Sequence, residues 1–150
     1  MTDCNPAHPK PVKKKKKLKV KKSKLQKSKE NPRSGFWERK ANEQWRKMIK
    51  LDGRCAINKN CAGGLEAHHL ITRANKPMKH ELMNGIALCS KHHKWDRELS
   101  AHTGPVAFSE WLRINKPHQY EFALKNRFYT GEKANYQERY ENIKQLLEDK

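Results

Sequence analysis

The sequence predicts an α+β fold that is mostly helical, with helices on both sides of a small ββα core. Two short apolar runs separated by a polar loop, over residues 65–71 and 85–89, predict a β-hairpin. Apolar residues that recur every three or four positions before and after it predict amphipathic helices. Cysteines and four of the eight histidines gather around the hairpin, which indicates that metal ions stabilise the core.

The composition indicates a protein that binds a polyanion. The chain has 150 residues with 34 Lys and Arg against 16 Asp and Glu, a formal charge of +18, which favours nucleic acid as the partner. No apolar run is long enough to span a bilayer, and no apolar segment follows the N-terminal lysines as in a secretory signal. We therefore expect no membrane partner and a cytoplasmic protein whose cysteines bind metal or stay free.

The chain divides into a tail and one domain. Residues 1–33 hold twelve lysines, all between Lys10 and Lys29, and we expect this tail to be disordered because like charges repel. The tail could track phosphates without reading sequence, direct nuclear import, or simply solubilise the chain, and Cys4 within it has no assigned role. Residues 34–150 form the predicted domain, with its core over about 54–98.

Amphipathic helices are expected on both sides of the core. The first has Ser34 as its N-cap and ends near Asp52-Gly53. Later helices are expected over residues 105–114, 117–128 and 136–147, the first of them starting at Gly104-Pro105. These C-terminal helices either pack on the core or mediate dimerisation, and the sequence leaves both open.

The core itself is a strand, a loop, a second strand and a helix that Ser90 is expected to cap. Cys55 and Cys61 precede the hairpin, while Cys89 and His92 end its second strand and open the helix. Two ligand pairs that flank a hairpin are typical of a tetrahedral structural Zn²⁺. The first pair is five residues apart, longer than usual, and buried free thiols are the alternative.

Three histidines remain outside this zinc prediction. His68 and His69 are neighbours on a strand, so their side chains are expected to point to opposite faces. One of them can turn towards His93 on the helix and hold a second metal ion. The other is then free to act as a general base, because an imidazole titrates near working pH.

The spacing His69-x14-Asn84-x8-His93, with the interleaved cysteines, resembles that of the HNH (ββα-metal) endonucleases. The resemblance covers Arg54 to about Arg97, and with residues 100–112 the chain is similar to small HNH proteins encoded by bacteriophages and prophages. By this resemblance His69 is the general base that activates water, and Asn84 braces the inter-strand loop that orients it. His68 and His93 hold the catalytic divalent metal. The structural zinc ligands are Cys55, Cys61, Cys89 and His92.

Some members of the family have a third metal-binding histidine where this chain has Arg97. The resemblance therefore implies two protein ligands, which favours Mg²⁺ or Mn²⁺ over tightly held zinc, and it makes Arg97 a candidate phosphate contact. Arg73, Lys76 and Lys79 in the inter-strand loop are further candidates for binding the phosphate backbone. Solvated loop charge is the alternative for each of them.

These observations together predict a metal-dependent endonuclease that hydrolyses phosphodiester bonds in DNA, with duplex DNA as the expected substrate. The alternatives are a zinc-stabilised nucleic-acid-binding module without catalysis, a nuclease that acts on RNA, and an assembly factor held by its C-terminal helices. If the chain is phage-encoded, we expect it in the host cytoplasm. A homodimer and a complex with another phage protein both stay open.

Overall fold

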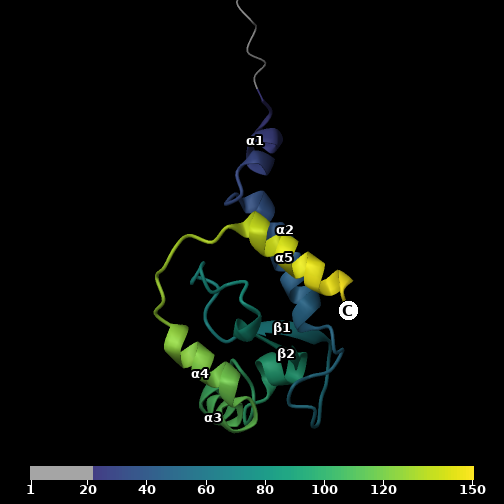
Figure 1. Cartoon of the computed structure of the whole chain (residues 1–150). Helices are drawn as coiled ribbons and strands as arrows, with labels where there is room; N and C mark the ends of the chain where they lie inside the picture. The colour runs from purple at the N-terminus through teal and green to yellow at the C-terminus, as the bar shows by residue number, and fades with distance from the viewer. Residues whose placement is uncertain (1–21) are drawn as a thin grey trace, which may run out of the picture.

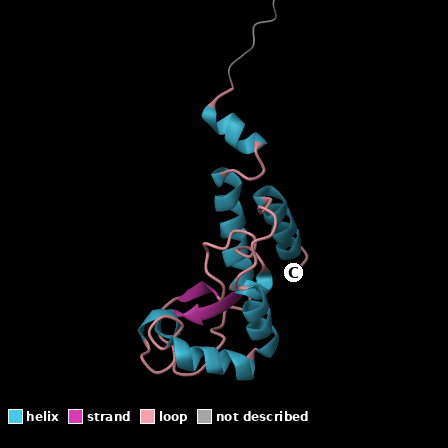
Figure 2. Ribbon diagram, turned by 90° about the vertical axis from the view of Figure 1, so that its left-hand side faces the viewer, coloured by secondary structure: helices cyan, strands magenta, loops and turns pink. Residues whose placement is uncertain are grey.

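A computed structural model of the chain describes residues 22–150. The fold is mostly helical α+β with one antiparallel hairpin, so the predicted fold class is confirmed (Figure 1; Figure 2). The elements in chain order are α1 (Lys24–Glu30), α2 (Gly35–Ile49), β1 (Leu65–His69), η1 (Leu82–Asn84), β2 (Gly85–Cys89), η2 (Lys91–Trp95), α3 (Pro105–Asn115), α4 (Pro117–Asn126) and α5 (Tyr136–Glu148). No helix of residues 22–150 is long and apolar enough to cross a membrane.

The hairpin lies between two pairs of helices, α2 with α5 and α3 with α4 (Figure 1). β1 and β2 pair so that Leu65 lies opposite Cys89 and His69 lies opposite Gly85. A Cβ at Gly85 would overlap the side chains of Ile49 and Trp45, so glycine is what lets α2 pack directly on this end of β2. The predicted bounds of β2 are confirmed, whereas β1 ends two residues earlier than predicted.

Helices α2 and α5 lie side by side on one side of the hairpin, and α1 lies beyond them (Figure 1; Figure 2). Ala41 and Trp45 of α2 and Tyr136 and Ile143 of α5 are buried, which explains the apolar periodicity of both helices. Ser34 occupies the predicted N-cap position, but its Oγ donates to the Ser28 carbonyl at 2.5 Å and makes no capping bond.

Helices α3 and α4 cover the other end of the hairpin (Figure 1). Phe108 and Leu112 of α3 pack in one buried cluster with Ile86, Leu88 and Cys89 of β2 and with Cys55 from the loop before the hairpin. Both helices begin with proline, as the sequence predicted, because the first helical position needs no amide hydrogen. The hairpin is thereby held between two helical layers, and its histidines stay at the edge.

The predicted helix after β2 is a single turn of the wider π type. The Asp96 amide donates to the Lys91 carbonyl five residues earlier, at 3.0 Å. Ser90 does not cap this turn, because its Oγ donates to the Gly64 carbonyl and to Glu66 instead. The predicted cap is wrong, because these bonds of the Ser90 hydroxyl connect the turn to β1 and to the residue before it.

Part of the predicted disordered tail is helical. Residues 24–30 form α1, which has no buried residue and is started by a capping box between Ser23 and Gln26. Trp37 of α2 donates its indole N–H to the Lys29 carbonyl at 2.8 Å. Disorder over all of 1–33 is therefore wrong for this segment, while residues 1–21, including Cys4 and most of the lysines, lie outside the described residues.

Candidate metal centres and active site

The four predicted zinc ligands come together in one cluster. Cys55, Cys61, Cys89 and His92 place their ligand atoms within 4.8 Å of one another. The two early cysteines reach the hairpin through a loop in which Asn58 and Asn60 adopt positive φ angles, a conformation that asparagine tolerates. The Ala56 amide also donates to the Ala87 carbonyl of β2 at 2.8 Å.

The distances within this cluster fit a tetrahedral metal. The Nδ1 atom of His92 lies 3.2 Å from Cys89 Sγ, 3.5 Å from Cys55 Sγ and 3.9 Å from Cys61 Sγ. A tetrahedral zinc with ordinary bond lengths separates sulfur and nitrogen ligands by about 3.5 Å. The other ring nitrogen of His92 lies 4.0 Å from Asp96 Oδ2, which is beyond direct hydrogen-bond distance.

The Cys61 thiol needs a nearby cation to ionise readily at this spacing, whereas hydrogen bonds from backbone groups and from the other cysteines lower the pKa of Cys89 against the effect of desolvation. The pKa of Cys61 is raised, first by desolvation and then by hydrogen bonds and charge from Cys55 and Cys89. A bound dication reverses that preference, since a coordinating thiol is deprotonated outright. The donor set of three sulfurs and one imidazole therefore fits Zn²⁺, and the predicted zinc ligands are placed together.

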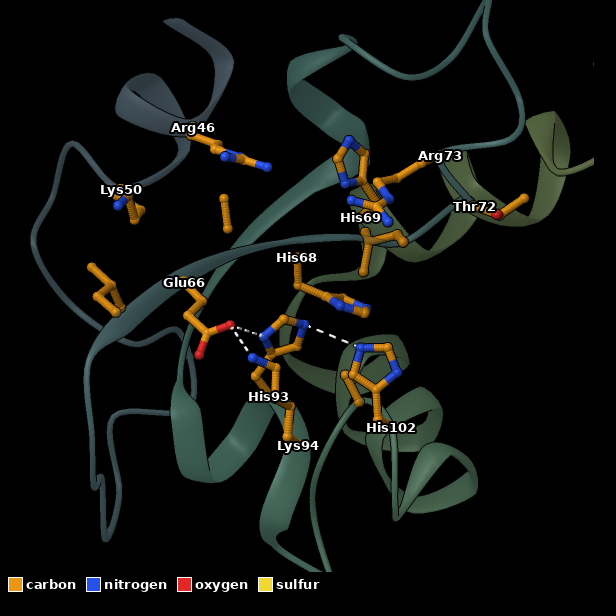
Figure 3. A pocket seen from close by; sticks show the side chains of 14 residues that line it. Arg46, Lys50, Glu66, His68, His69, Thr72, Arg73, His93, Lys94 and His102 are labelled. Carbon is orange, nitrogen blue, oxygen red and sulfur yellow. Dashed lines mark hydrogen bonds and ion pairs between the residues drawn. The ribbon is translucent and has the colours of Figure 1, made fainter. Parts of the chain in front are cut away.

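A second cluster consists of three histidines. His68 from β1, His93 from η2 and His102 from the loop before α3 place one nitrogen each within 4.8 Å of the others (Figure 3). The Nε2 atoms of His93 and His102 are 3.2 Å apart. Metal–nitrogen bonds of about 2.0–2.1 Å separate adjacent imidazole ligands by about 3.0–3.4 Å, so this spacing fits a metal site.

The surroundings of His68 and His93 lower their pKa values and so favour the neutral forms that can bind a metal. Burial, followed by the positive charges that His93, His102 and His69 would carry, lowers the pKa of His68 to about 3. Glu66, on the same face of β1, accepts a hydrogen bond from His93 Nδ1 at 2.8 Å. Because Nδ1 of His93 carries its proton there, Nε2 keeps a free lone pair directed at His102.

Glu66 is itself held in the ionised state. Lys94 Nζ lies 2.7 Å from Oε2, and Ser90 Oγ lies 3.0 Å from Oε1. The hydrogen bond from Lys94, followed by those from His93 and Ser90, lowers the pKa of Glu66 to about 2 against the effect of desolvation. The carboxylate is therefore a permanent acceptor for the Nδ1 proton of His93.

His102 reaches the cluster because its loop folds back onto η2. Asp96 Oδ1 accepts the amides of Glu98 and Leu99, and Thr103 Oγ1 donates to the Asp96 carbonyl at 2.7 Å. The Ala101 amide donates to the His92 carbonyl at 3.0 Å. These bonds place the residue after Ala101 beside His93.

His69 points away from this cluster and packs against α2. Its ring stacks on Trp45 with centroids 3.9 Å apart, and its Nε2 lies 3.0 Å from the Lys79 carbonyl. A carbonyl can only accept, so Nε2 is protonated and Nδ1 keeps its lone pair. Burial, followed by the charges of Lys79, Arg73 and Arg46, lowers the pKa of His69 to about 4 against the bond to the carbonyl.

Asn84 is fully buried and ties together the ends of the inter-strand loop. Its Nδ2 donates to the carbonyls of Met78 at 2.9 Å and Ile71 at 3.3 Å, and its Oδ1 accepts the Ile71 amide. These bonds fix the backbone immediately before Lys79, whose carbonyl holds His69. The arrangement is that of a brace, and the effect of this brace on catalysis stays a prediction.

The candidate phosphate contacts lie in different surroundings. Arg73 lines a pocket of about 870 Å³ together with the three histidines and His69. Lys76 and Lys79 both bind Glu38 of α2 at 2.8 Å, and Lys79 is buried. Arg97 is exposed and does not line this pocket. Of the four predicted contacts, only Arg73 therefore lines this pocket.

Sequence reasoning missed four contributors to the pocket. Glu66 could have been identified from the sequence, because it lies two residues before His68 on a strand and so points to the same face of the strand as His68. Arg46 and Lys50 could also have been identified, because they follow Trp45 at the end of an amphipathic helix and lie one turn apart. His102 could not, since it lies outside regular structure and follows no ligand spacing.

No known family model, curated protein or solved structure matches the chain. The class of protein that the structure defines is a mostly helical α+β domain with a Cys₃His cluster at its hairpin. Function therefore has to be argued from the chemistry of the two clusters and the pocket beside them.

Proposed function

We propose that the protein is a metal-dependent HNH endonuclease that hydrolyses phosphodiester bonds in DNA. The observation that carries the proposal is one pocket that holds a three-histidine cluster and, on the same strand, a separate histidine with a free nitrogen. A protein that merely bound nucleic acid through a zinc-stabilised fold would need neither of them.

The chain's own residues account for the steps that involve protons and positioning. His69 Nδ1 removes a proton from a water molecule, which attacks the phosphorus. Trp45 and the Lys79 carbonyl hold the ring in place, and Asn84 fixes the backbone just before Lys79 through the Met78 carbonyl. A divalent cation on His68, His93 and His102 would stabilise the negative charge that develops on the phosphate and on the departing oxygen.

The ligand chemistry refines the choice of metal. Two protein ligands would favour Mg²⁺ or Mn²⁺, but a third imidazole makes the donor set all nitrogen. Mg²⁺ prefers oxygen ligands and retains its waters, whereas imidazole is a common ligand of transition metals such as Zn²⁺, Fe²⁺ and Ni²⁺. Of the two metals that the sequence favoured, we propose Mn²⁺ rather than Mg²⁺ for this site, because Mn²⁺ is the transition metal of the pair.

The test is cleavage of duplex DNA, single-stranded DNA and RNA by zinc-loaded protein, with Mn²⁺ or Mg²⁺ added. The proposal expects cleavage of DNA that Mn²⁺ supports best and that His69→Ala abolishes. Cleavage of RNA alone would favour the RNA-directed alternative. Binding of nucleic acid without turnover under any of these metals would favour the non-catalytic module.

A further inference from the structure

Helix α2 brings two cations to the pocket beside the histidine cluster. Arg46 and Lys50 lie one helical turn apart and both line the pocket, with Arg73 also on its lining (Figure 3). Arg46 follows Trp45, the ring on which His69 stacks. The helix that fixes the position of His69 therefore also fixes the position of these two cations.

These cations are free to meet an anion. Within residues 22–150, neither Arg46 nor Lys50 has a carboxylate within 4.0 Å, while other cations nearby are paired. Lys76 and Lys79 share Glu38, whose pKa their hydrogen bonds lower to about 2, and Lys94 pairs with Glu66. The charge available at the pocket thus comes from α2 and Arg73 more than from the lysines of the inter-strand loop.

The cations stand on two sides of the histidine cluster. Figure 3 shows Arg46 and Lys50 to one side of His68 and Arg73 to the other, and all three line the same pocket. An extended polyanion that puts one phosphate at the histidine cluster can therefore run along the pocket from Arg46 and Lys50 to Arg73. Phosphates on either side of that one then meet Arg46 and Lys50 or Arg73.

We propose that Arg46 and Lys50 bind the phosphates of the strand being cleaved and guide it into the pocket, with Arg73 holding the strand on the far side. This inference rests on the proposed nuclease function and names how that site holds its substrate. The contacts are made to phosphates, so they give affinity and register without sequence preference.

The experiment measures binding of a short fluorescent DNA duplex to full-length, zinc-loaded protein by fluorescence anisotropy. All variants carry His69→Ala, so that the duplex stays intact when Mn²⁺ is present. Arg46→Ala with Lys50→Ala is compared with Lys40→Ala with Lys47→Ala. The second pair removes the same charge from exposed positions of α2 that do not line the pocket.

We expect the pocket pair to weaken binding at least tenfold more than the control pair at about 0.15 M salt. The slope of log affinity against log salt should fall by about 1.8 for the pocket pair, since each lost phosphate contact removes about 0.9. Equal losses of affinity and slope in both pairs would overturn the inference, because net charge alone would then explain binding. Absence of any duplex binding would also overturn it.

Two further measurements distinguish a loss of these phosphate contacts from a folding defect, and this inference from the nuclease proposal. Arg46→Lys with Lys50→Arg keeps both charges and should restore binding, while circular dichroism checks that every variant is folded. If the parent chain cleaves DNA but the two alanine pairs bind alike, the α2 contacts are wrong and the nuclease proposal stands. If no substrate is cleaved but the pocket pair still loses binding, the α2 contacts stand and the nuclease proposal fails.

Discussion

The imidazole of His102 comes within 3.2 Å of His93 although it lies in a loop outside the ββα unit. If the cluster binds metal, removing this third nitrogen should cost much of the affinity. We expect His102→Ala to weaken Mn²⁺ binding at least tenfold, measured by isothermal titration calorimetry on zinc-loaded protein. His118→Ala, at an exposed position on α4, is the matched control. Equal Mn²⁺ affinities in both variants would mean that His102 is not a ligand.

Glu66 acts on the metal through His93. In Glu66→Gln the charged acceptor is lost, so the Nδ1–H form of His93 is no longer enforced, and Mn²⁺ affinity should fall by about ten- to a hundredfold. The ¹⁵N chemical shifts of the His93 ring report the tautomer directly and would not respond to a merely structural role. Unchanged shifts and affinity would show that Glu66 does not act on the metal site, and Glu110→Gln, at an exposed position of α3, is the control.

His80 links folding to pH at a distance from the metal ligands. Its Nε2 donates to Asn42 Oδ1 at 2.9 Å, and burial, followed by the charge of Lys79, lowers its pKa to about 3. The folded pKa lies below the unfolded value of about 6.5, so this contribution is present above that value and is lost as pH falls towards 3.

This coupling between protonation of His80 and folding predicts a different pH dependence of the free energy of unfolding in the parent and in a His80 variant. Between about pH 7 and about pH 5, His80 should lower the free energy of unfolding by about 2 kcal/mol. His80→Gln lacks this titration, so chemical denaturation of the variant should show a pH dependence smaller by that amount. Other buried histidines contribute equally to both proteins and cancel in the comparison. Parallel pH profiles would show that His80 is not buried in its neutral form.

Single residues were predictable where chemistry and spacing coincide. The six cysteine and histidine positions assigned to metals all fall in one of two clusters, because Cys-x₂-His and the strand histidines leave few geometric choices. Lys76 and Lys79 show the limit, since their pairing with Glu38 depends on how α2 crosses the loop. That crossing is a tertiary contact, and no local pattern in the sequence encodes it.

At the scale of elements, the Cys₃His cluster joins the irregular segment before β1 to the end of β2. Cys61 is exposed and Cys55 is buried, and both come from a loop with little regular structure. The hairpin and η2 bury too little apolar surface to hold that loop without metal. Zinc is therefore expected to contribute on the order of 10 kcal/mol to the folding of this unit.

Cys61→Ser tests that expectation without removing buried volume. We expect less than one zinc per chain by elemental analysis and a lower melting temperature in the variant. Cys4→Ser, to which the sequence assigns no role, should keep the zinc and the melting temperature of the parent. If the chain stays folded at its normal melting temperature in a strong chelator, the cluster is a set of free thiols.

Elements with strong periodicity were predictable, and those set by single side chains were not. Helix α5 follows from its apolar spacing, and α3 and α4 follow from Pro105 and Pro117. The π-type turn η2 did not follow, because Ser90 bonds to Glu66 across the hairpin instead of to its own turn. Helix α1 was missed because its capping box stands in a segment dominated by lysine charge.

For the whole molecule, the two clusters are joined through adjacent residues. His92 belongs to the Cys₃His cluster and His93 to the histidine cluster, on the same turn of η2. Helix α2 supports the other side of the pocket through Trp45, and α5 packs along α2. A structural metal at the first cluster would thus fix the geometry of the second.

The sequence predicted two separate metal sites, one structural and one catalytic, but it did not predict the shape of the pocket. Net charge and the histidine pattern indicated nucleic acid and metal. The third histidine, the carboxylate behind His93 and the cations on α2 are brought in by long-range packing, which depends on the complete fold. Function is carried by this assembled pocket more than by any one motif.

The most direct test of the central claim is nicking of supercoiled plasmid by zinc-loaded protein in Mn²⁺, with His69→Ala beside the parent and His118→Ala as control. Loss of a general base should slow cleavage by about 10²–10⁴-fold, while His118→Ala should match the parent. Circular dichroism and zinc content establish that both variants are folded. Plasmid nicked by His69→Ala at the rate of the parent would contradict the proposed mechanism.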